Sequence, residues 1–294
     1  MIDKLVTAIV ITHNRRNLLK KAIDSVLNQT YKNIELIIVN DNSTDGTREY
    51  LDNFKNVKNI RVINIVGKHS RGGGYARNVG IKNSKGTYIA FLDDDDRWTS
   101  DKIKKQVDFL NNHLEYGMVY CRRLDVDYSS HKKNLEPLNS TLSGDMSNAC
   151  FENTICTSSS MMVRKSLLDS VGSFDENLHY WQDFELNIRI AHNTLIGFIN
   201  EPLMIYSLGK NDKNKLTNKF TGWWEAINYI KTKHRKYFNS LPQKTLLAWK
   251  IMVYKDAARR CRQSHLYLQE RHYRYKVWNL EKSVYNLIRL IINY

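Results

Sequence analysis

The chain has 294 residues, of which 42% are hydrophobic, so it is long enough for one large domain or two. Its four cysteines lack C-x-x-C spacing, which argues against a zinc site or a disulfide framework and favours a reducing compartment. The net charge of +15 is uneven, because residues 205–294 hold 19 Lys+Arg against 5 Asp+Glu while residues 1–204 hold 26 against 25. This contrast predicts a nearly neutral body joined to a basic tail.

The first hundred residues alternate between apolar strands and helical segments. Strands are predicted at residues 5–12, 34–39, 60–66 and 88–92. A helix begins at Asn17, a second runs through Leu51 and Phe54, and a third covers residues 75–83. This alternation predicts an α/β fold with a doubly wound, mostly parallel sheet and helices on both faces.

The second half is predicted with the same patterns. A helix places Ile103, Val107, Leu110 and Leu114 on one face, and a strand follows at residues 117–121. Residues 122–154 are less regular and polar, and strands and loops are expected there. Later strands are expected at residues 158–163, 195–199 and 203–206, with helices at 166–171 and 183–191. The N-terminus begins directly with a strand, so we expect no signal peptide. No apolar run approaches the roughly 20 residues that span a bilayer.

Four consecutive carboxylates, residues 93–96, follow the apolar strand that ends at Leu92. In an extended chain Asp93 and Asp95 share one face, while Asp94 and Asp96 share the other. On an exposed loop these side chains would form a solvated acidic turn. At the carboxyl end of a buried strand, where ligands of parallel sheets bind, they would call for a cation such as Mg²⁺ or Mn²⁺.

Other polar residues at predicted strand ends allow two interpretations each. Thr12, Asn14, Asp41 and Asn42 could contact a nucleotide or only cap the following helices. The cations Lys68, Arg71 and Arg77 could neutralise a diphosphate or remain solvated, and Arg77 could also pair with the aspartates. Asp183 opens a helix, where the helix dipole already favours a carboxylate, so its role as a general base needs further support.

Seven sequence blocks occur in an order that resembles the family 2 inverting glycosyltransferases with the GT-A fold. The blocks are V-I-T-H-N-R at 10–15, S-V-L-N-Q-T-Y at 25–31, E-L-I-I-V-N-D-N-S-T-D-G-T at 35–47, A-R-N-V-G at 76–80, F-L-D-D-D-D at 91–96, G-S-F-D-E at 172–176, and Q-D-F-E-L at 182–186 followed by Arg189. The resemblance covers residues 4–206. It implies a GT-A nucleotide-sugar transferase domain at 1–206.

The resemblance also implies roles for individual residues. Nucleotide-binding positions correspond to Thr12, Asn14, Asp41, Arg71, Arg77, Asp93 and Asp94. Asp95, together with Asp93, matches the metal-binding D-x-D motif for Mn²⁺ or Mg²⁺, and Asp183 matches the catalytic base. Two residues depart from the family pattern: Asn40 replaces an Asp, and Gln182 replaces the Glu before Asp183. The implied activity is inverting hexosyl transfer from a UDP-sugar to a glycan or lipid-linked glycan, in polysaccharide or lipopolysaccharide biosynthesis.

Residues 207–294 are predicted to form a basic, aromatic helical region outside the resemblance. One helix face would carry Trp223, Trp224, Ile227 and Ile230, another helix would carry Leu246, Leu247, Trp249, Ile251 and Tyr254, and an amphipathic ending would carry Val284, Leu287, Ile288 and Ile291. Such helices suit an acceptor or a membrane with anionic lipid, although they could simply pack on the body. We therefore expect a cytoplasmic enzyme, peripheral on the inner membrane.

Two other functions remain open at this point. The basic aromatic tail could bind nucleic acid, but no recognised nucleic-acid motif is present and the neutral body would go unexplained. A metal-dependent nucleotidyltransferase would share the acidic motif but would not need Asp183.

Overall fold

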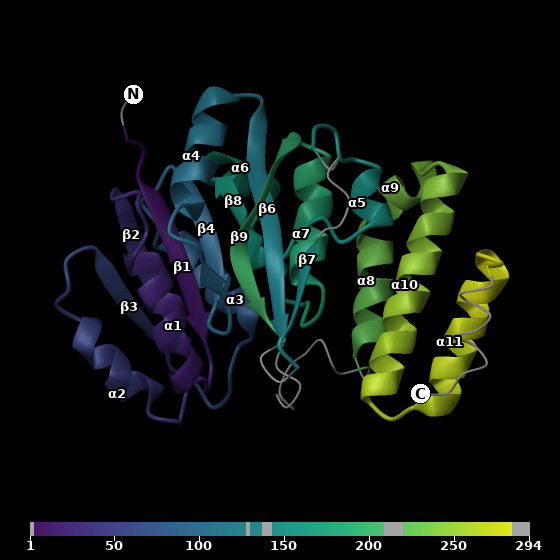
Figure 1. The fold of residues 1–294 in the computed structure, drawn as a ribbon, viewed down its shortest axis with the longest axis horizontal. Helices are drawn as coiled ribbons and strands as arrows, with labels where there is room; N and C mark the ends of the chain where they lie inside the picture. Colours follow the sequence, from purple (N-terminus) through teal and green to yellow (C-terminus); the bar gives the residue numbers. More distant parts are fainter. Residues whose placement is uncertain (1–2, 128–129, 137–142, 209–219, 221, 284–294) are drawn as a thin grey trace. The chain divides into compact units, whose positions relative to one another are not determined.

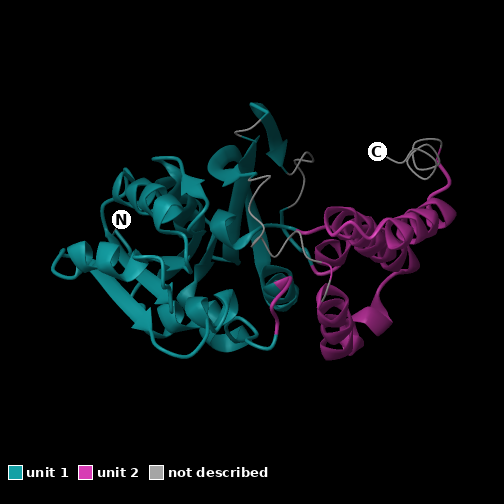
Figure 2. Ribbon diagram, turned by 90° about the horizontal axis from the view of Figure 1, so that it is seen from below, with its two compact units in different colours: residues 1–146, 155–177, 182–210 teal, residues 147–154, 178–181, 211–294 magenta. Residues whose placement is uncertain are grey.

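A computed structural model describes residues 3–127, 130–136, 143–208, 220 and 222–283. The chain divides into two compact units, coloured separately in Figure 2. Unit 1 comprises residues 1–146, 155–177 and 182–210, and unit 2 comprises residues 147–154, 178–181 and 211–294. Unit 2 therefore includes two short segments from the part of the sequence that precedes the basic tail.

Unit 1 is built around a single mixed sheet (Figure 1). Its strands are β1 (Val6–Thr12), β2 (Ile34–Asp41), β3 (Ile60–Ile65), β4 (Tyr88–Asp93), β5 (Arg97–Trp98), β6 (Tyr116–Asp127), β7 (Lys132–Glu136), β8 (Met161–Arg164) and β9 (Leu195–Ser207). They lie in the order β3-β2-β1-β4-β8-β6-β9-β5, with β7 paired to β6. The first four strands are parallel, and β8 runs antiparallel to both β4 and β6.

The helices of unit 1 connect these strands. They are α1 (Arg16–Leu27), α2 (Thr47–Leu51), α3 (Gly73–Lys82), α4 (Lys102–Asn112), α6 (Lys165–Val171) and α7 (Gln182–Ala191), with 3₁₀ turns at Asp52–Phe54 and Ser158–Ser160. The alternation of strands and helices predicted for residues 5–93 is therefore present. It gives β1 the central position among the parallel strands, with β2 on one side and β4 on the other.

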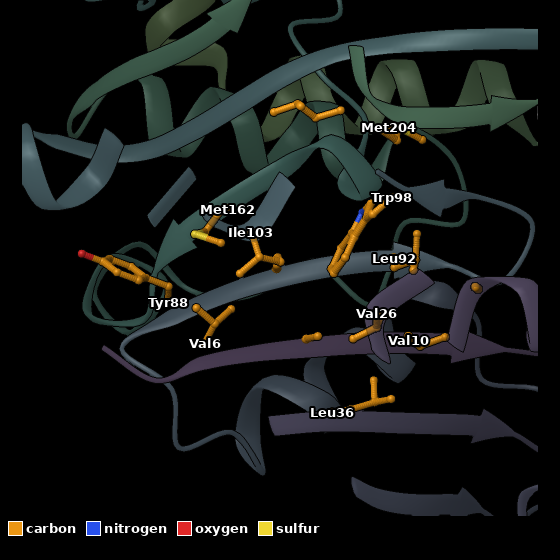
Figure 3. Packing of buried hydrophobic residues seen from close by; sticks show 14 of the residues in the cluster. Val6, Val10, Val26, Leu36, Tyr88, Leu92, Trp98, Ile103, Met162 and Met204 are labelled. Carbon is orange, nitrogen blue, oxygen red and sulfur yellow. The ribbon is translucent and has the colours of Figure 1, made fainter. Parts of the chain in front are cut away.

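Side chains of β1 alternate between two apolar layers. Val10 belongs to the buried cluster that also contains Val26 of α1 and Ile103 of α4 (Figure 3). Ile9 belongs to the other layer, where its Cγ2 lies only 2.5 Å from the position that a Cβ on Gly80 of α3 would occupy. Only glycine permits this close approach of helix and strand. Helices therefore cover both faces of the sheet, as the sequence predicts.

The second half of unit 1 differs from the sequence prediction in three details. The two late strands are one long strand, β9, whereas the end of β6 and all of β7 lie in the segment where strands and loops were expected. Residues 158–160 form a 3₁₀ turn before β8 rather than the start of a strand. Leu114 is 75% exposed because α4 ends at Asn112, two residues before it. The apolar spacing continues to Leu114 although the helix has already ended, so this spacing alone does not locate the end of α4.

Unit 2 contains α5 (Ala149–Glu152), α8 (Trp223–Lys233), α9 (Arg235–Ser240), α10 (Gln243–Gln263) and α11 (Tyr267–Leu280). Its interior is aromatic. Trp249 of α10 contacts the rings of Phe151 and Phe238, with centroids 6.4 and 5.1 Å away. The predicted face of α8 is largely correct, since Trp223, Ile227 and Ile230 are buried, but Leu247 of α10 is 40% exposed. The predicted amphipathic ending from Val284 lies outside the described residues.

None of the described helices is long and apolar enough to cross a membrane.

Candidate functional site

Three parallel strands end side by side at one edge of the sheet. The register places Thr12 of β1 opposite Asn40 of β2, and Ile11 of β1 opposite Asp93 of β4. Asp41 is the last residue of β2. The predicted residues Thr12, Asp41 and Asp93 therefore meet at the carboxyl edge, where ligands of such sheets bind.

The four aspartates alternate in burial, but residues 94 and 95 form a turn instead of the expected extended chain, and the backbone N–H of Asp96 donates to the Asp93 carbonyl over 3.1 Å. Asp94 and Asp96 are 4% and 2% exposed, whereas Asp93 and Asp95 are only partly buried. The hydroxyl of Thr12 donates to Asp94 Oδ2 over 2.7 Å. Burial raises the pKa of Asp94 to about 6, although the neighbouring guanidinium of Arg15 opposes this shift. Asp93 and Asp95 thus remain the carboxylates that a ligand at this edge could reach.

Arg15 bridges two members of the acidic run. Its Nη1 lies 3.0 Å from Asp94 Oδ1 and 3.2 Å from Asp95 Oδ2. Arg15 is not among the residues predicted for the site, although it lies in the same block as Thr12. A cation at this place could be expected on electrostatic grounds, because a run of four carboxylates at a buried strand end needs cations nearby.

Arg77 of α3 is the second cation at the acidic run, and it is 7% exposed. Its Nη2 donates to Asp93 Oδ1 over 2.5 Å, and its Nη1 donates to Gln182 Oε1 over 3.1 Å. The guanidinium also packs over the ring of Phe174, 5.2 Å from its centroid. One buried arginine therefore joins the end of β4 to the start of α7, the helix that carries Asp183.

The approach of α3 to α7 depends on glycine. A Cβ on Gly73 would lie 2.9 Å from Arg77 Nη1, and a Cβ on Gly74 would lie 3.1 Å from Gln182 Nε2. A side chain at either position would displace the bridge between the two helices. Gly73 and Gly74 therefore have a local steric reason, and Gly72 before them adopts a positive φ of 89°, although the three glycines do not form a dinucleotide-binding loop.

Asp183 is the second residue of α7 and is partly buried. Burial raises its pKa above the ordinary value for an aspartate, and the charge of Asp93 acts in the same direction. The charge of Arg77 and the backbone N–H of Phe184, which donates to Asp183 Oδ1 over 2.8 Å, oppose the shift. A carboxylate with a raised pKa is a better proton acceptor than an ordinary aspartate.

Asp41 contacts the loop before α3. Its carboxylate accepts from the Ser70 hydroxyl over 2.6 Å and from the backbone N–H groups of Arg71 and Gly72 over 2.9 and 2.8 Å. The Arg71 side chain itself lies over the ring of Tyr75. Asp41 therefore holds this basic loop at the edge of the sheet, beside the end of β2.

Asn14 and Asn40 serve neighbouring turns. Asn14 adopts a positive φ of 54°, and its Oδ1 accepts from the backbone N–H of Thr44 over 2.7 Å. Asn40, which stands where the family usually has Asp, donates to Asn64 Oδ1 over 2.8 Å and accepts from the N–H of Ser43. The side chains of Asn14 and Asn40 thus fix the loop after β2 rather than contacting the acidic run.

The selected residues thus fall into four groups of direct contacts. Asp93, Arg77 and Gln182 form the first, and Asp183 follows directly on Gln182. In the second group, Thr12 contacts Asp94, and Arg15 contacts Asp94 and Asp95. Asp41 contacts the loop at Ser70–Gly72 in the third group, and Asn14 contacts Ser43 and Thr44 in the fourth. Burial raises the pKa of Tyr206 of β9, and the negative charges of Asp96, Asp95 and Asp93 act in the same direction. Nothing in the sequence pattern of β9 selects it.

The donor chemistry fits a hard divalent cation such as Mg²⁺ or Mn²⁺. Asp93 and Asp95 offer carboxylate oxygens at the partly exposed face of the run. Arg77 Nε is buried without a hydrogen-bond partner among the described residues, and its N–H is a donor that suits an anion such as a phosphate. No trio of His, Cys, Asp or Glu converges as a complete metal site within the described part of the chain. Mg²⁺ usually takes one or two carboxylates from a protein, and substrate phosphates complete its ligand set.

Comparisons with solved structures show a GT-A-type fold. The TarS fragment of residues 1–349 from Staphylococcus aureus, solved with UDP-GlcNAc, is similar with a TM-score of 0.65 and 16% identity, over 98% of this chain and 78% of that one. The mannosyltransferase PcManGT from Pyrobaculum calidifontis, solved with GDP-Man and Mn²⁺, has a TM-score of 0.59 and 16% identity, over 99% of this chain and 79% of that one.

Sequence comparisons identify related glycosyltransferases. An uncharacterized glycosyltransferase from Rickettsia bellii is 34% identical over 78% of this chain and 32% of its own length. The UDP-Glc:α-D-GlcNAc-diphosphoundecaprenol β-1,3-glucosyltransferase WfaP of Escherichia coli is 41% identical over 41% of this chain and 48% of its own. The chain spans between about a third and two thirds of the length of the first curated relatives that it matches. The model of glycosyl transferase family 2 matches residues 7–172, more than half of the chain, and the protein therefore belongs to that family.

Proposed function

We propose that the protein transfers a hexose from a UDP-sugar to a hydroxyl group of a glycan or lipid-linked glycan, with inversion at the sugar C1. Membership of the family gives the glycosyl-transfer reaction, and relatives support the donor and acceptor. The TarS structure contains UDP-GlcNAc, and the name of WfaP specifies a UDP-glucose donor and a diphosphoundecaprenol-linked acceptor. The product would belong to a surface polysaccharide or lipopolysaccharide.

The observation that carries the proposal is the double contact of Arg77. Because this buried guanidinium contacts both Asp93 and Gln182, the end of β4 and the start of α7 are held together. Asp183 is the next residue after Gln182. A donor phosphate bound near Asp93 and an acceptor oxygen near Asp183 would thus share one site, as in-line displacement requires.

The nucleotide would bind along the carboxyl edge. Asp41 would read the base, the partly exposed Asp93 would contact the ribose while the buried pair of Thr12 and Asp94 supports it, and the loop carrying Arg71 would close over the diphosphate. Asn14 would support this pocket through its bonds to the loop after β2. Arg77 would contribute positive charge beside the diphosphate, where negative charge develops as the sugar departs.

Asp93 and Asp95 would hold a Mn²⁺ or Mg²⁺ ion, with Asp95 as the direct ligand. When bound, such an ion neutralises charge on the leaving diphosphate. Arg15 contacts both Asp94 and Asp95, so it already balances part of this negative charge. Mn²⁺ accompanies the GDP-Man donor in the PcManGT structure, which supports a divalent ion in a fold of this type.

Asp183 would act as the general base. Its carboxylate would accept the proton of the acceptor hydroxyl, whose oxygen would then attack the sugar C1 from the side opposite the departing nucleotide. The elevated pKa that burial gives Asp183 favours this proton transfer. One base and no side-chain nucleophile means a single displacement, so an α-linked donor would give a β-linked product.

Residues 1–206 would form the transferase domain, and residues 207–294 would associate with the acceptor or with the cytoplasmic face of the inner membrane. The exposed side of α11 supports this proposal, because Leu268 is 82% exposed beside the exposed Tyr267 and Arg271. Apolar and aromatic side chains next to cations suit an interface with anionic lipid.

Flotation on vesicles tests the membrane role. The full chain should bind phosphatidylglycerol vesicles but not phosphatidylcholine vesicles, and Leu268→Ser should weaken binding. Leu114→Ser is the matched control, because Leu114 is 75% exposed but belongs to unit 1. Equal binding to both vesicles, or equal loss in both variants, would contradict the membrane proposal.

A panel of UDP-sugars tests the catalytic proposal directly. Release of UDP from UDP-glucose, UDP-GlcNAc and UDP-galactose would be followed with Mn²⁺, with Mg²⁺ and with EDTA, and GDP-mannose would serve as a second donor class. The proposal expects metal-dependent UDP release from at least one UDP-sugar. Turnover of GDP-mannose alone, or full turnover in EDTA, would contradict it.

A further inference from the structure

The residues directly before the proposed base belong to unit 2. The chain leaves unit 1 after Asn177, passes through unit 2 as Leu178–Trp181, and returns to unit 1 at Gln182. Asp183 therefore lies two residues beyond Trp181. Whatever fixes the backbone at Trp181 also fixes the point from which α7 begins.

Trp181 adopts a backbone conformation that bulky residues rarely take. Its φ is +55°, in the left-handed region where glycine and asparagine are usual. Such a conformation in a non-glycine residue costs free energy, and it persists only when surrounding contacts fix it. This outlier lies beside the proposed base, where backbone strain is most often functional.

The contacts that hold Trp181 come from within unit 2. Its ring meets Trp223 of α8 and Trp249 of α10 edge to face, with centroids 5.9 and 6.0 Å apart. Both partners are almost fully buried, at 0% and 4% exposure. T-shaped aromatic pairs of this kind have a preferred geometry, so the two rings restrict the position of Trp181.

The residue before Trp181 is held in the same way. The guanidinium of Arg260 lies 5.7 Å from the ring centre of Tyr180 and 5.3 Å from that of Trp223. Arg260 is 2% exposed, and its Nε donates to Asp256 Oδ2 over 2.7 Å. A cation buried between aromatic faces and a carboxylate has little freedom to move. Two consecutive residues, Tyr180 and Trp181, are therefore clamped by α8 and α10.

We propose that Trp181 is a positioning residue, whose fixed backbone sets the point from which α7 begins and so orients Asp183 for proton abstraction. This inference rests on the proposed role of Asp183. Loss of the clamp should lower the rate of transfer while leaving the nucleotide site, which lies on other elements, unchanged.

The test compares Trp181→Ala and Trp249→Ala with Trp224→Ala. Trp224 is a suitable control because its ring packs against Trp223 and Tyr273, whereas the ring of Trp181 packs against Trp223 and Trp249. Hydrogen–deuterium exchange would be measured over residues 178–186 and over residues 88–96. We expect faster exchange over 178–186 in both test variants, unchanged exchange over 88–96, and no change at either segment in the control.

Turnover is the second readout. With UDP-sugar hydrolysis as the probe, kcat should fall about tenfold or more in Trp181→Ala and Trp249→Ala, since small misplacements of a catalytic group are costly. KM for the donor and the Kd for UDP with Mn²⁺ should stay within about twofold, because the nucleotide site is untouched. The double variant should lose no more than the worse single variant, since both act through one clamp. Trp181→Phe, which keeps an aromatic ring, should recover most of the rate.

Three results would overturn the inference. One is exchange over 178–186 that rises no more in the test variants than in Trp224→Ala. Another is raised exchange with an unchanged kcat. The third is a loss of UDP binding equal to the loss of rate, which would indicate a general structural role.

If a tryptophan-to-alanine variant does not fold, Trp249→Phe is judged by the same exchange measurement. Full hydrolysis in Asp183→Asn would instead refute the proposed base, and the exchange comparison would still report on the clamp.

Discussion

Each unit contains a buried arginine, and the two make different kinds of contact. Arg77 of unit 1 joins residues distant in sequence, Asp93 and Gln182, at the edge of the sheet. Arg260 of unit 2 pairs with Asp256 four residues earlier on its own helix, and it packs against aromatic rings. The first contact joins two proposed catalytic elements directly, whereas the second belongs to the aromatic contacts that hold Tyr180 and Trp181. The partners of a buried charge therefore show which role it serves.

The polar network of unit 1 should be sensitive to loss of its proposed base. Asp183→Asn should reduce sugar transfer by a factor on the order of 10²–10⁴, the usual contribution of general base catalysis. Donor binding should persist because the nucleotide contacts remain. Initial rates and UDP titrations would measure both quantities, with the exposed Asp169→Asn of α6 as a matched control. Transfer at the wild-type rate would exclude Asp183 as the base.

The same variant should be more stable than the wild type near neutral pH. Because the folded protein raises the pKa of Asp183, its charged form is disfavoured in the folded state, and this cost is present above the folded pKa. The cost falls as pH drops through that pKa, and the asparagine removes it. Thermal unfolding at pH 7 should therefore show a higher Tm for Asp183→Asn, and a lower Tm would contradict the raised pKa.

Arg77→Lys tests whether Arg77 acts through its positive charge alone or through the shape of its guanidinium. Lysine keeps the positive charge but lacks the planar fork that reaches both Asp93 and Gln182. We expect kcat/KM to fall by roughly 10- to 100-fold, as for a loss of positioning. Arg61→Lys, at an exposed site on β3, is the control and should have no effect. A normal rate in Arg77→Lys would mean that the bridge between β4 and α7 is dispensable.

How far the sequence predicts the site can be judged from these residues. The strand pattern was enough to expect Thr12, Asp41 and Asp93 at one edge. The aspartates do alternate in burial, but the period of two of an extended strand is not the reason, because residues 94 and 95 lie in a turn. Arg15 and Gln182 were missed as contacts because their partners are 79 and 105 residues away. Local periodicity carries no information about pairs at that separation. The assignments of base, metal ligands and nucleotide contacts remain predictions.

The fold, like the site, is predicted from the sequence only where local patterns determine it. The family blocks and the alternation of elements predict the parallel half of the sheet and the helices on both of its faces. They do not reveal that residues 147–154 and 178–181 belong to unit 2, because membership depends on long-range aromatic contacts such as Trp181 with Trp223. The fusion of two predicted strands into β9 was equally hidden, since the exposed residues in its middle read as a turn.

Lys102 of α4 is a buried cation of unit 1 outside the proposed site. It is fully buried, and its Nζ donates to Gln106 Oε1 over 2.7 Å and lies over the ring of Trp98. Burial lowers its pKa from 10.5 to about 8, which corresponds to a cost of about 3 kcal/mol for holding the charge at neutral pH.

Lys102→Met should therefore stabilise the protein by about 1–2 kcal/mol at pH 7, because the lost contacts offset part of that gain. In the wild type, stability should rise between pH 8 and 10.5, since the unfolded chain binds the proton more tightly in that window. Urea unfolding of both proteins at pH 7 and 9.5 would measure this. A difference between the two proteins that does not shrink at the higher pH would contradict it.

Arg260→Met should have the smallest effect. It removes the contacts with the rings of Tyr180 and Trp223, but Asp256 keeps Arg259 as a partner. We expect a loss of about 1 kcal/mol in stability, as for a buried cation–π contact, and unchanged UDP binding. Chemical unfolding and UDP titration would be compared with those of Arg262→Met, an exposed residue on the same helix. Loss of UDP binding would place Arg260 in the site.

Calorimetric titration of UDP tests the central claim, that the carboxyl edge of unit 1 binds a metal–nucleotide complex through Asp95. The titration would use wild-type protein with Mn²⁺ and with EDTA, Asp95→Ala with Mn²⁺, and Asp108→Ala as a control on the exposed side of α4. The account predicts binding in Mn²⁺ for the wild type and the control, and strongly weakened binding in EDTA and in Asp95→Ala. Equal binding in EDTA, or in Asp95→Ala, would contradict it.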